Sequence, residues 1–409
     1  MAAVLFQTFR LAARNLLRQR RRAFLALATV CGGVVAYLLA GGFIHWIFQD
    51  MRESTIHSQL GHLQITRPGY LREGLGDPYR YLLPADTSAL EADLHSRFRT
   101  IAPRLAFSGL ISKGDDTLSF VGEGIDPQRE APVTRAITIV AGRDLTAAPP
   151  ASVLLGEGLA ANLGAQPGDR VVLLASSADG GINAVELEVA GLFATITKAY
   201  DDTVLRAPID IARQLMRVEG ATSWVVLLDD TEATARTVAE LTQRLPADRF
   251  EIIPWYELAD FYNKTVTLFS RQVGVVRILI ALIVVLSISN TLSMAVIERT
   301  GEIGTAMALG VRRRGILTLF LAEGALLGLV GGVIGVLAGH ALGALVSAIG
   351  IPMPPPPGMA RGYIGQIAIS PALALDAFLL AFLTTLVASI FPAWKASRMN
   401  IVDALRQQR

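Results

Sequence analysis

Four long apolar stretches stand out from the mixed pattern of polar and hydrophobic residues along the chain. They are Phe24–Phe48, Ile278–Ile297, Ile316–Ile351 and Pro371–Ala393, and their only formal charges are Glu323 and Asp376. A bilayer core about 30 Å thick needs roughly 20 apolar residues in a helix, so each stretch predicts a membrane span. We expect the third span to end near position 348, before the Pro354–Pro357 run, which a helix cannot include. Buried core helices of a large soluble protein are the alternative, disfavoured because such helices seldom run uncharged for so long.

Between the first two apolar stretches the pattern changes to short segments typical of a folded α+β domain. His62–Thr66 and Glu186–Val189 alternate as strands do, and Trp224–Leu228 is a short apolar run. Thr231–Leu245 has the apolar spacing of a helix, with Thr231 as its expected N-cap. Leu159–Leu163 predicts a shorter helix that ends near Gly164. We therefore expect an α+β domain inserted between two membrane helices.

The charges divide along the same boundary. The net charge of +2 conceals −9 over residues 49–272, which hold 21 Lys/Arg and 30 Asp/Glu, and +11 over the remaining 185 residues. With 52% hydrophobic and 18% charged residues, the composition excludes a simple cytosolic enzyme and a disordered chain. It also argues against a nucleic-acid binder, because the excess basic residues flank apolar spans and do not line a soluble face.

The basic residues predict the orientation of the spans, since Lys and Arg accumulate on the cytoplasmic side. One cluster precedes the first span, one lies between the second and third, and one follows the fourth. In that order, the members of the three clusters are Arg10, Arg14, Arg18, Arg20, Arg21 and Arg22, then Arg299, Arg312, Arg313 and Arg314, then Lys395, Arg398, Arg406 and Arg409. Four spans place all three clusters, and both termini, in the cytoplasm and the acidic block outside. The first apolar run is too long for a cleaved signal peptide.

The expected organisation follows as nine segments. In chain order these are an amphipathic cytoplasmic segment 1–23, a first span 24–48, a periplasmic α+β domain 49–272, a second span 273–297, a cytoplasmic loop 298–315, a third span 316–348, a periplasmic Pro-rich loop 349–370, a fourth span 371–393 and a cytoplasmic tail 394–409. The single cysteine, Cys31, lies in the first span, so the external domain is expected to be stable without a disulfide.

The chain lacks the sequence signatures of common enzymes. None of its four lysines follows the Gly-rich pattern of a phosphate-binding loop, so we expect no ATPase site and no cofactor in this chain. There is no His-Glu-x-x-His motif and no Gly-x-Ser-x-Gly elbow. His57 and His62 are weak candidates for zinc ligands, and packing or surface roles are favoured for both. These absences favour a transport or coupling protein over an enzyme.

The predicted spans carry small and polar residues at suggestive positions. Gly324, Gly328 and Gly332 recur every four residues, as do Gly335 and Gly339, a spacing that lets helices approach closely. Ser287 to Ser293 in the second span favour interhelical hydrogen bonds over a substrate path. Glu323 is an intramembrane acid, for which a cytoplasmic-leaflet arginine is the expected partner and proton coupling the alternative.

Three motifs resemble those of one family, the FtsX/MacB-type permeases of ABC transporters. Glu298–Gly310 reads E-R-T-G-E-I-G-T-A-M-A-L-G, close to the first cytoplasmic loop of these permeases. Pro392–Arg398 followed by Asp403–Arg406 is similar to their C-terminal ending, and Ala13–Arg18 to their N-terminal amphipathic segment. The order of one span, a large external domain and three further spans also agrees.

The resemblance implies a permease subunit that works by mechanotransmission in a bacterial inner membrane. Two permeases, from the same or a sister chain, would assemble with two copies of a separate ATPase that binds ATP and Mg²⁺. Only 23 residues precede the first span, so we expect no fused ATPase domain there. The layout is closest to LolC/LolE-type lipoprotein-releasing permeases, which implies membrane lipids and a periplasmic lipoprotein carrier or adaptor as further partners.

Two groups of residues take expected roles from the resemblance. The coupling group, which is expected to contact the ATPase, is Glu298, Arg299, Glu302, Ile303, Gly304, Leu309 and Gly310. Glu298 and Glu302 are one helical turn apart, so they can share one face towards basic residues of the ATPase; a solvated face is the alternative. The candidate lipid or substrate groove comprises Phe43, Trp46, Ile47, Ile278 and Leu282.

Three functions remain open at this stage. The first is extraction of a lipidated or hydrophobic substrate from the outer leaflet. The second is MacB-like export of small hydrophobic compounds or peptides with an adaptor. The third is FtsX-like regulation of a cell-wall hydrolase, which the size of the external domain disfavours.

Overall fold

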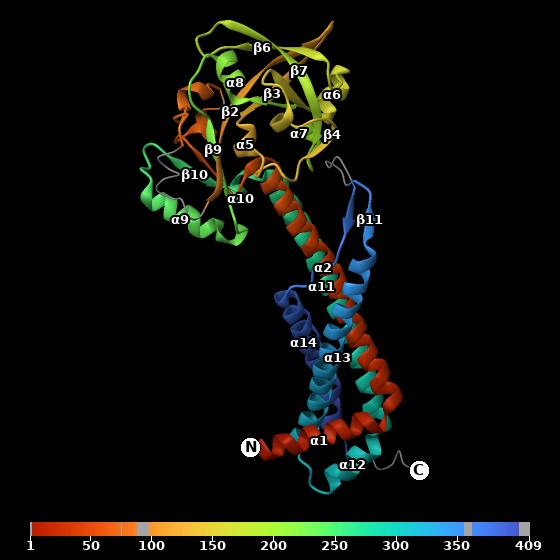
Figure 1. Cartoon of the computed structure of the whole chain (residues 1–409). Coiled ribbons are helices and arrows are strands. Elements are labelled where there is room, and N and C mark those ends of the chain that lie inside the picture. Colours follow the sequence, from red (N-terminus) through yellow and green to blue (C-terminus); the bar gives the residue numbers. More distant parts are fainter. Residues whose placement is uncertain (1, 75, 88–97, 356–361, 401–409) are drawn as a thin grey trace. The chain divides into compact units, whose positions relative to one another are not determined.

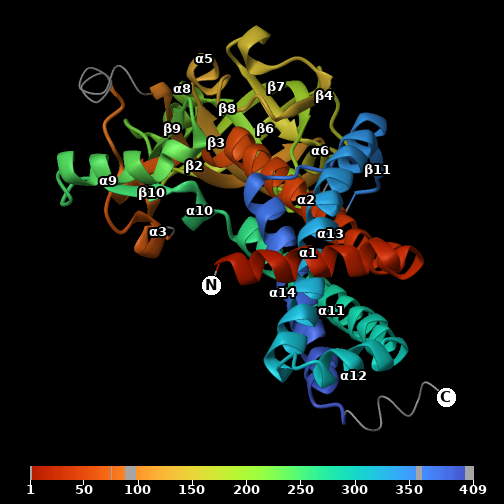
Figure 2. The ribbon, with the colours of Figure 1, turned by 90° about the horizontal axis from the view of Figure 1, so that it is seen from below.

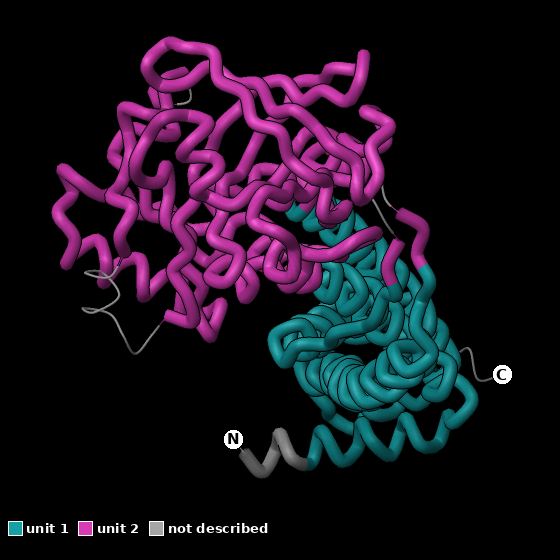
Figure 3. Tube along the Cα trace, turned by 45° about the horizontal axis from the view of Figure 1, so that its top comes forward, with its two compact units in different colours: residues 1–48, 266–352, 364–409 teal, residues 49–265, 353–363 magenta. Residues whose placement is uncertain are grey.

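The computed structural model describes residues 2–74, 76–87, 98–355 and 362–400, with side chains from residue 7 onward. Part of the Pro-rich loop and the C-terminal Asp403–Arg406 motif therefore lie outside the described residues. The chain divides into two compact units (Figure 3). Unit 1 comprises residues 1–48, 266–352 and 364–409, and unit 2 comprises residues 49–265 and 353–363.

Unit 1 is built from helices, four of which are long and apolar enough to cross a membrane. These four are α2 (Arg20–Thr55), α11 (Asp260–Glu298), α13 (Arg313–Ile349) and α14 (Pro371–Ser397). Two further helices complete the unit, α1 (Ala2–Arg18) and α12 (Thr300–Ala308). Figure 1 and Figure 2 show that α1 runs across the bundle axis near α12. A long apolar helix is thus present at each of the four predicted spans, and α13 ends at Ile349, close to the expected end of the third span.

The core of unit 1 draws on all four long helices. One buried cluster contains Val34 and Leu38 of α2, Val284 and Ile288 of α11, and residues of α13 and α14. A second cluster, with Ile303 and Met307 of α12, Ile316 and Phe320 of α13 and Ala393 of α14, lies at the α12 end of the bundle. The short helix α12 is therefore packed into the bundle by its apolar side.

Unit 2 is an α+β domain around a ten-stranded mixed sheet with the order β10-β1-β9-β2-β3-β8-β5-β7-β4, and β6 pairs with β2 and β7. The strands are β1 (Leu63–Thr66), β2 (Phe98–Lys113), β3 (Asp116–Ile125), β4 (Thr138–Gly142), β5 (Ser152–Gly156), β6 (Arg170–Ser176), β7 (Ile182–Ala194), β8 (Val204–Pro208), β9 (Ser223–Leu228) and β10 (Glu251–Pro254). Most neighbours are antiparallel, but β3–β8 and β5–β7 are parallel. The predicted α+β class of the inserted domain is confirmed.

Short helices cover this sheet. They are α3 (Tyr70–Glu73), α5 (Pro127–Glu130), α6 (Glu157–Leu163), α7 (Lys198–Asp201), α8 (Ile209–Met216), α9 (Thr234–Arg244) and α10 (Trp255–Leu258). Gly164 ends α6 in the left-handed conformation expected there, with φ of 63°. The main core packs α6 and α8 on β2, β3, β5, β6 and β7, and a second core lies beneath α9.

Two local predictions need correction. Thr231 does not cap the helix that follows, because residues 231–233 form a 3₁₀ turn capped by the Asp230 side chain, and α9 begins at Thr234. The Thr231 hydroxyl instead contacts Glu53 and His62. The loop at 349–370 is not wholly irregular, since β11 (Ile351–Met353) and β12 (Tyr363–Gly365) pair across it.

Candidate functional site

The predicted coupling residues lie at one end of unit 1, on and beside α12. Glu298 ends α11, and Gly310 follows α12 with φ of 97°, a conformation that favours glycine. Ile303 and Met307, one turn apart, are buried against Phe320 and Ala393, whereas Leu309 is 82% exposed. The helix is therefore anchored by one face, and an apolar leucine is left in solvent at its end.

The two predicted coupling glutamates both have partners within the chain. Arg18 of α1 donates to both carboxylate oxygens of Glu302, at 2.5 and 2.6 Å, and Arg22 of α2 forms a two-pronged pair with Glu298. The Arg18 guanidinium holds the pKa of the Glu302 carboxyl below its usual range. Because all four side chains are at least one-third exposed, each pair contributes little to stability. The pairs join α1 and the start of α2 to the coupling segment.

Glu323 forms a buried ion pair with the coupling segment. Its Oε1 accepts from Arg299 at 3.0 Å and from the Asn15 amide of α1 at 2.8 Å. Glu323 is 2% exposed and Arg299 is 8% exposed, and the guanidinium lies over the Phe320 ring at 5.9 Å. The arginine partner expected for this acid is thus Arg299. The pair ties together α1, the junction of α11 with α12, and α13.

The glycines of α13 form two contact faces. A Cβ on Gly324, Gly328 or Gly332 would come within 2.6, 2.1 and 2.9 Å of α14 atoms, the closest of them Thr385 Oγ1. A Cβ on Gly335 or Gly339 would come within 2.7 and 2.6 Å of Val34 and Leu38 on α2. Because real Cβ contacts are longer than 3 Å, neither α14 nor α2 could approach α13 as closely if these positions bore side chains.

The predicted groove residues have unequal exposure. Ile278 and Leu282 of α11 are 68% and 53% exposed and one turn apart. Phe43 and Trp46 of α2 are half-buried. Ile47 is 7% exposed, so it does not belong to an open surface of this chain. The assignment of Ile47 to a lipid-facing groove stays a prediction, as it does for the other four residues.

A second polar contact inside the bundle was not predicted from the sequence. Tyr37 of α2 donates to Asp376 of α14 at 2.6 Å, and Arg277 of α11 pairs with the same carboxylate at 3.0 Å. Arg277 is about half exposed and lies next to the second apolar stretch, so no apolar periodicity marks it as a partner of Asp376. This contact joins three of the four long helices.

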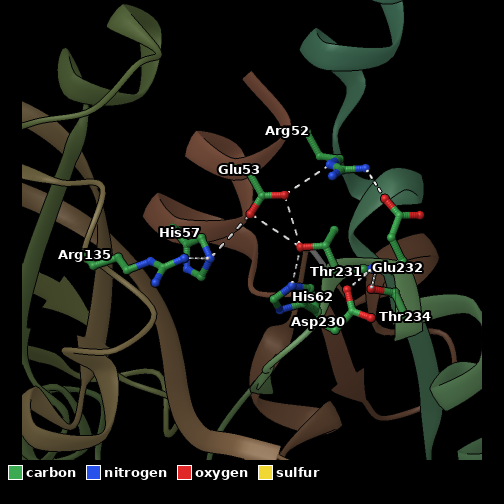
Figure 4. Close-up of polar contacts among 9 residues, drawn as sticks. All are labelled: Arg52, Glu53, His57, His62, Arg135, Asp230, Thr231, Glu232 and Thr234. Atoms are coloured by element: carbon green, nitrogen blue, oxygen red, sulfur yellow. Dashed lines mark hydrogen bonds and ion pairs between the residues drawn. The ribbon is translucent and has the colours of Figure 1, made fainter. Parts of the chain in front are cut away.

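In unit 2, the end of α2 is held by polar side chains of the domain (Figure 4). Arg52 donates to Glu232 at 2.8 Å, and Thr231 lies 3.1 Å from Glu53. His57 of the π-helical turn Ile56–Leu60 lies 2.7 Å from an Arg135 nitrogen. These contacts fix the last turns of α2 against the 231–233 turn and the strand-connecting segment around Arg135.

His62 is held as a neutral hydrogen-bonding group. The Leu228 N–H donates to its Nδ1 at 3.1 Å, so its Nε2 carries the proton and donates to Thr231 at 2.9 Å. Burial and the neighbouring His57 lower the pKa of His62 to about 4. Among the described residues no three His, Cys, Asp or Glu side chains are placed to hold a metal ion. Both histidines therefore serve packing and hydrogen bonding here.

The carbonyl groups at the end of the same helical segment are bound by two buried arginines. Arg206 of β8 donates to the Ser58 carbonyl at 2.9 Å, and Arg104 of β2 donates to the Gln59 carbonyl. Glu123 of β3 lies 2.9 Å from Arg206, and Glu130 of α5 pairs with Arg104. Burial raises the pKa of Glu123, but Arg206 and Arg104 outweigh it and hold that pKa below its usual range.

We refer to Arg104, Arg206, Glu123 and Glu130 as the arginine clamp. Helix C-termini carry partial negative charge and unpaired carbonyls, so two guanidinium groups suit this end of the segment. The sequence carries one signal of the clamp, because Arg206 is a charge within the apolar segment Val204–Ala207. A buried strand tolerates such a charge only when it is paired.

Comparison with known proteins places these features in a family. A model of the MacB-like periplasmic core domain matches residues 23–244, and a model of the FtsX-like permease C-terminal region matches residues 274–401. The macrolide export ATP-binding/permease protein MacB of Hyphomonas neptunium is 30% identical over 215 residues, which cover 51% of this chain and 31% of that protein.

Other relatives have related names. The lipoprotein-releasing system transmembrane protein LolC of Xylella fastidiosa is 24% identical over 277 residues, covering 63% of this chain and 65% of LolC. The chain thus covers less than two thirds of both curated relatives. The crystal structure of the periplasmic region of MacB from Actinobacillus actinomycetemcomitans aligns at 16% identity with a TM-score of 0.36, over 49% of this chain and 92% of that one.

The core-domain model alone spans more than half of the chain, and the permease model takes up most of the rest. With its four candidate membrane helices and the inserted core domain, the chain belongs to the FtsX/MacB family of ABC transporter permeases.

Proposed function

We propose that this permease works by mechanotransmission, in which the coupling segment moves α2 and α2 moves unit 2. The observation that carries the proposal is the attachment of one continuous helix at both ends. At its start, Arg22 pairs with Glu298 of the coupling segment. At its end, Arg206 and Arg104 bind the carbonyls of Ser58 and Gln59. Between these points α2 runs without a break from Arg20 to Thr55.

The driving force in this proposal comes from a separate ATPase subunit, present in two copies and binding ATP and Mg²⁺. It docks on α12 and the turn that follows, where Leu309 is the most exposed apolar side chain of the coupling group. The buried pair between Arg299 and Glu323 makes this segment one mechanical unit with α1 and α13. A second permease, the same or a sister chain, completes the complex in the inner membrane.

The substrate class we propose is a lipidated or otherwise hydrophobic molecule taken from the outer leaflet. Support comes from α11, on which Ile278, Leu279, Leu282, Ile283 and Leu286 are all more than half exposed. A helix that buries so few of its apolar residues needs lipid, substrate or a second permease against it. The similarity to a protein named for lipoprotein release agrees with this class; a periplasmic carrier or adaptor would then receive the substrate.

The docking step is tested with Leu309→Arg, which places a charge on the exposed leucine. The full-length variant, reconstituted with its ATPase partner, should lose at least tenfold in permease-stimulated ATP turnover. Leu17→Arg is the matched control, since Leu17 of α1 is also an exposed cytoplasmic leucine, at 67%. Equal turnover in both variants would remove α12 as the docking element.

A charge exchange tests whether Glu302 acts within the chain. Glu302→Arg alone opposes Arg18 and should reduce stimulated turnover. Adding Arg18→Glu restores the pair with reversed charges, so turnover should recover if the pair with α1 is what matters. Failure to recover, with an intact fold, would instead assign Glu302 to contact with the ATPase.

A further inference from the structure

Unit 2 contains a cleft of about 740 Å³ lined by residues of β2, β3 and β6. Its base is formed by buried side chains, among them Phe107, Ala175 and Met216. Tyr70, Pro78 and Tyr79, from the segment between β1 and β2, line it as well. The volume lies in the range of about 300–1,000 Å³ that is usual for small-molecule sites.

The strand positions that face this cleft depart from the usual pattern. In β6, buried and exposed residues alternate strictly from Arg170 to Ser176, and the outward positions of such a strand are normally polar. Here Val172 and Leu174 occupy outward positions, and Leu174 is paired directly with exposed Leu110 of β2. Val121 of β3 and Ile182 of β7 are also exposed, at 50% and 74%. Four neighbouring strands thus contribute apolar side chains to one solvent-facing surface.

Exposed apolar side chains are concentrated at the cleft and are sparse elsewhere in the described part of unit 2. Among the described residues of unit 2, eight large hydrophobic side chains are exposed, and four of them line the cleft. None of the fifteen lining residues is charged, although residues 49–272 hold 51 charged residues in 224. A charged ligand would lose its hydration here without gaining an ionic partner, which is costly. The lining therefore selects an uncharged ligand.

The lining also has the few polar groups that an amphiphile requires. Four of the lining residues bear a hydroxyl, Ser108, Ser176, Tyr70 and Tyr79, and that of Tyr70 also bonds to Thr222. The strands β2 and β6 approach closely here, because a Cβ on Gly109 would lie 2.2 Å from the Leu174 carbonyl oxygen.

We propose that this cleft binds the hydrocarbon chain of a neutral amphiphile, with its polar end held by the hydroxyls. The apolar side chains of Leu110, Leu174 and Ile182 contact the hydrocarbon chain of the ligand, and binding removes their surface from water. The site does not depend on the mechanotransmission proposed above, because binding is measured without ATP. A loss of ligand binding at the cleft can therefore be told apart from a failure of transport.

The experiment uses the full-length protein in lipid nanodiscs, with the photoreactive residue p-benzoylphenylalanine in place of Ile182. Radiolabelled dioctanoylglycerol is the neutral probe and radiolabelled decanoate the anionic one. We expect saturable capture of dioctanoylglycerol, at least fivefold above decanoate. The matched position is Val140 of β4, which is exposed but does not line the cleft, and capture there should be at background.

A second substitution tests the apolar wall. Leu174→Asp in the Ile182 photoprobe protein should reduce capture at least fivefold, and Leu174→Thr, which keeps a strand-forming residue, about twofold. Val140→Asp is the control for an added surface charge. Equal labelling at positions 182 and 140, equal capture of decanoate, or no effect of Leu174→Asp in a folded protein would each overturn the proposal. Cross-links to a second copy of the chain, in place of the probe, would assign the surface to self-association and also overturn it.

Discussion

Arg299 and Glu323 form a buried ion pair in the part of unit 1 next to α12. Removing one partner leaves an uncompensated buried charge, which costs about 3–5 kcal/mol. We therefore expect Arg299→Met to lower the free energy of unfolding by about that amount. Replacing both partners by apolar residues of similar volume, Arg299→Met with Glu323→Leu, should be nearly neutral, because such replacements are often neutral or stabilising.

The geometry allows the contribution of Asn15 to be separated. Its amide donates to the same carboxylate oxygen at 2.8 Å, and a hydrogen bond to a charged group is worth about 1.5–3 kcal/mol. Asn15→Leu should thus cost less than Arg299→Met, since Arg299 still neutralises the acid. Denaturant unfolding of the purified chain in micelles measures these three variants and the single variant Glu323→Leu, which completes the double-mutant cycle.

Function gives a second readout of the same cycle. The doubly apolar variant should fold yet lose stimulated ATP turnover if the polar pair links α13 to the coupling segment. An Arg299→Met cost below about 1 kcal/mol would refute the assignment of a buried ion pair. A doubly apolar protein as unstable as the single variant would refute the reasoning that the unpaired charge causes the loss.

Three further predictions concern packing, pH and the arginine clamp. Gly328→Ala should destabilise the bundle by about 1–3 kcal/mol, since the added methyl overlaps Thr385 and overpacking has that cost. Gly274→Ala has open space around its Cβ and should stabilise the bundle by up to about 1 kcal/mol. Thermal unfolding measures both variants. The pKa of His62 is lowered in the folded state to about 4 from 6.5, so its contribution to the free energy of unfolding is fully present above pH 6.5. This contribution should decline as pH falls from 6.5 to 4. His62→Asn should flatten that part of the profile of stability against pH. Arg206→Met leaves Glu123 buried without its closest partner and should cost about 3–5 kcal/mol in denaturant unfolding, whereas Arg170→Met, at a side chain 79% exposed, should change stability by less than 0.5 kcal/mol.

Each of these has a result that contradicts it. Equal effects at Gly328 and Gly274 would mean that the α13–α14 contact is not close. A wild-type profile unchanged between pH 6.5 and 4 would mean that His62 is not held neutral. Similar small losses for Arg206→Met and Arg170→Met would mean that the clamp is not buried.

The sequence was sufficient for the features that depend on composition and period. An uncharged run of 20 or more residues must be a helix in lipid, because its backbone groups can be satisfied only within the segment. The four spans, the inserted α+β domain and the family resemblance were all available on that basis, and the family and fold class are confirmed. The contacts of the coupling residues with an ATPase, and the proposed substrate, stay predictions.

Tertiary structure decided which charges meet. Arg18 and Glu302 are 284 positions apart, and Asn15 and Glu323 are 308 apart, so no local pattern connects them. The arginine clamp and the apolar surface around Leu174 likewise depend on strands brought together from distant parts of the chain. Ile47 shows the converse: its apolar side chain suited a lipid-facing or a packed position equally well, and only the folded chain made it buried. Hydrophobicity determines that a residue leaves water, but the fold determines which surface receives it.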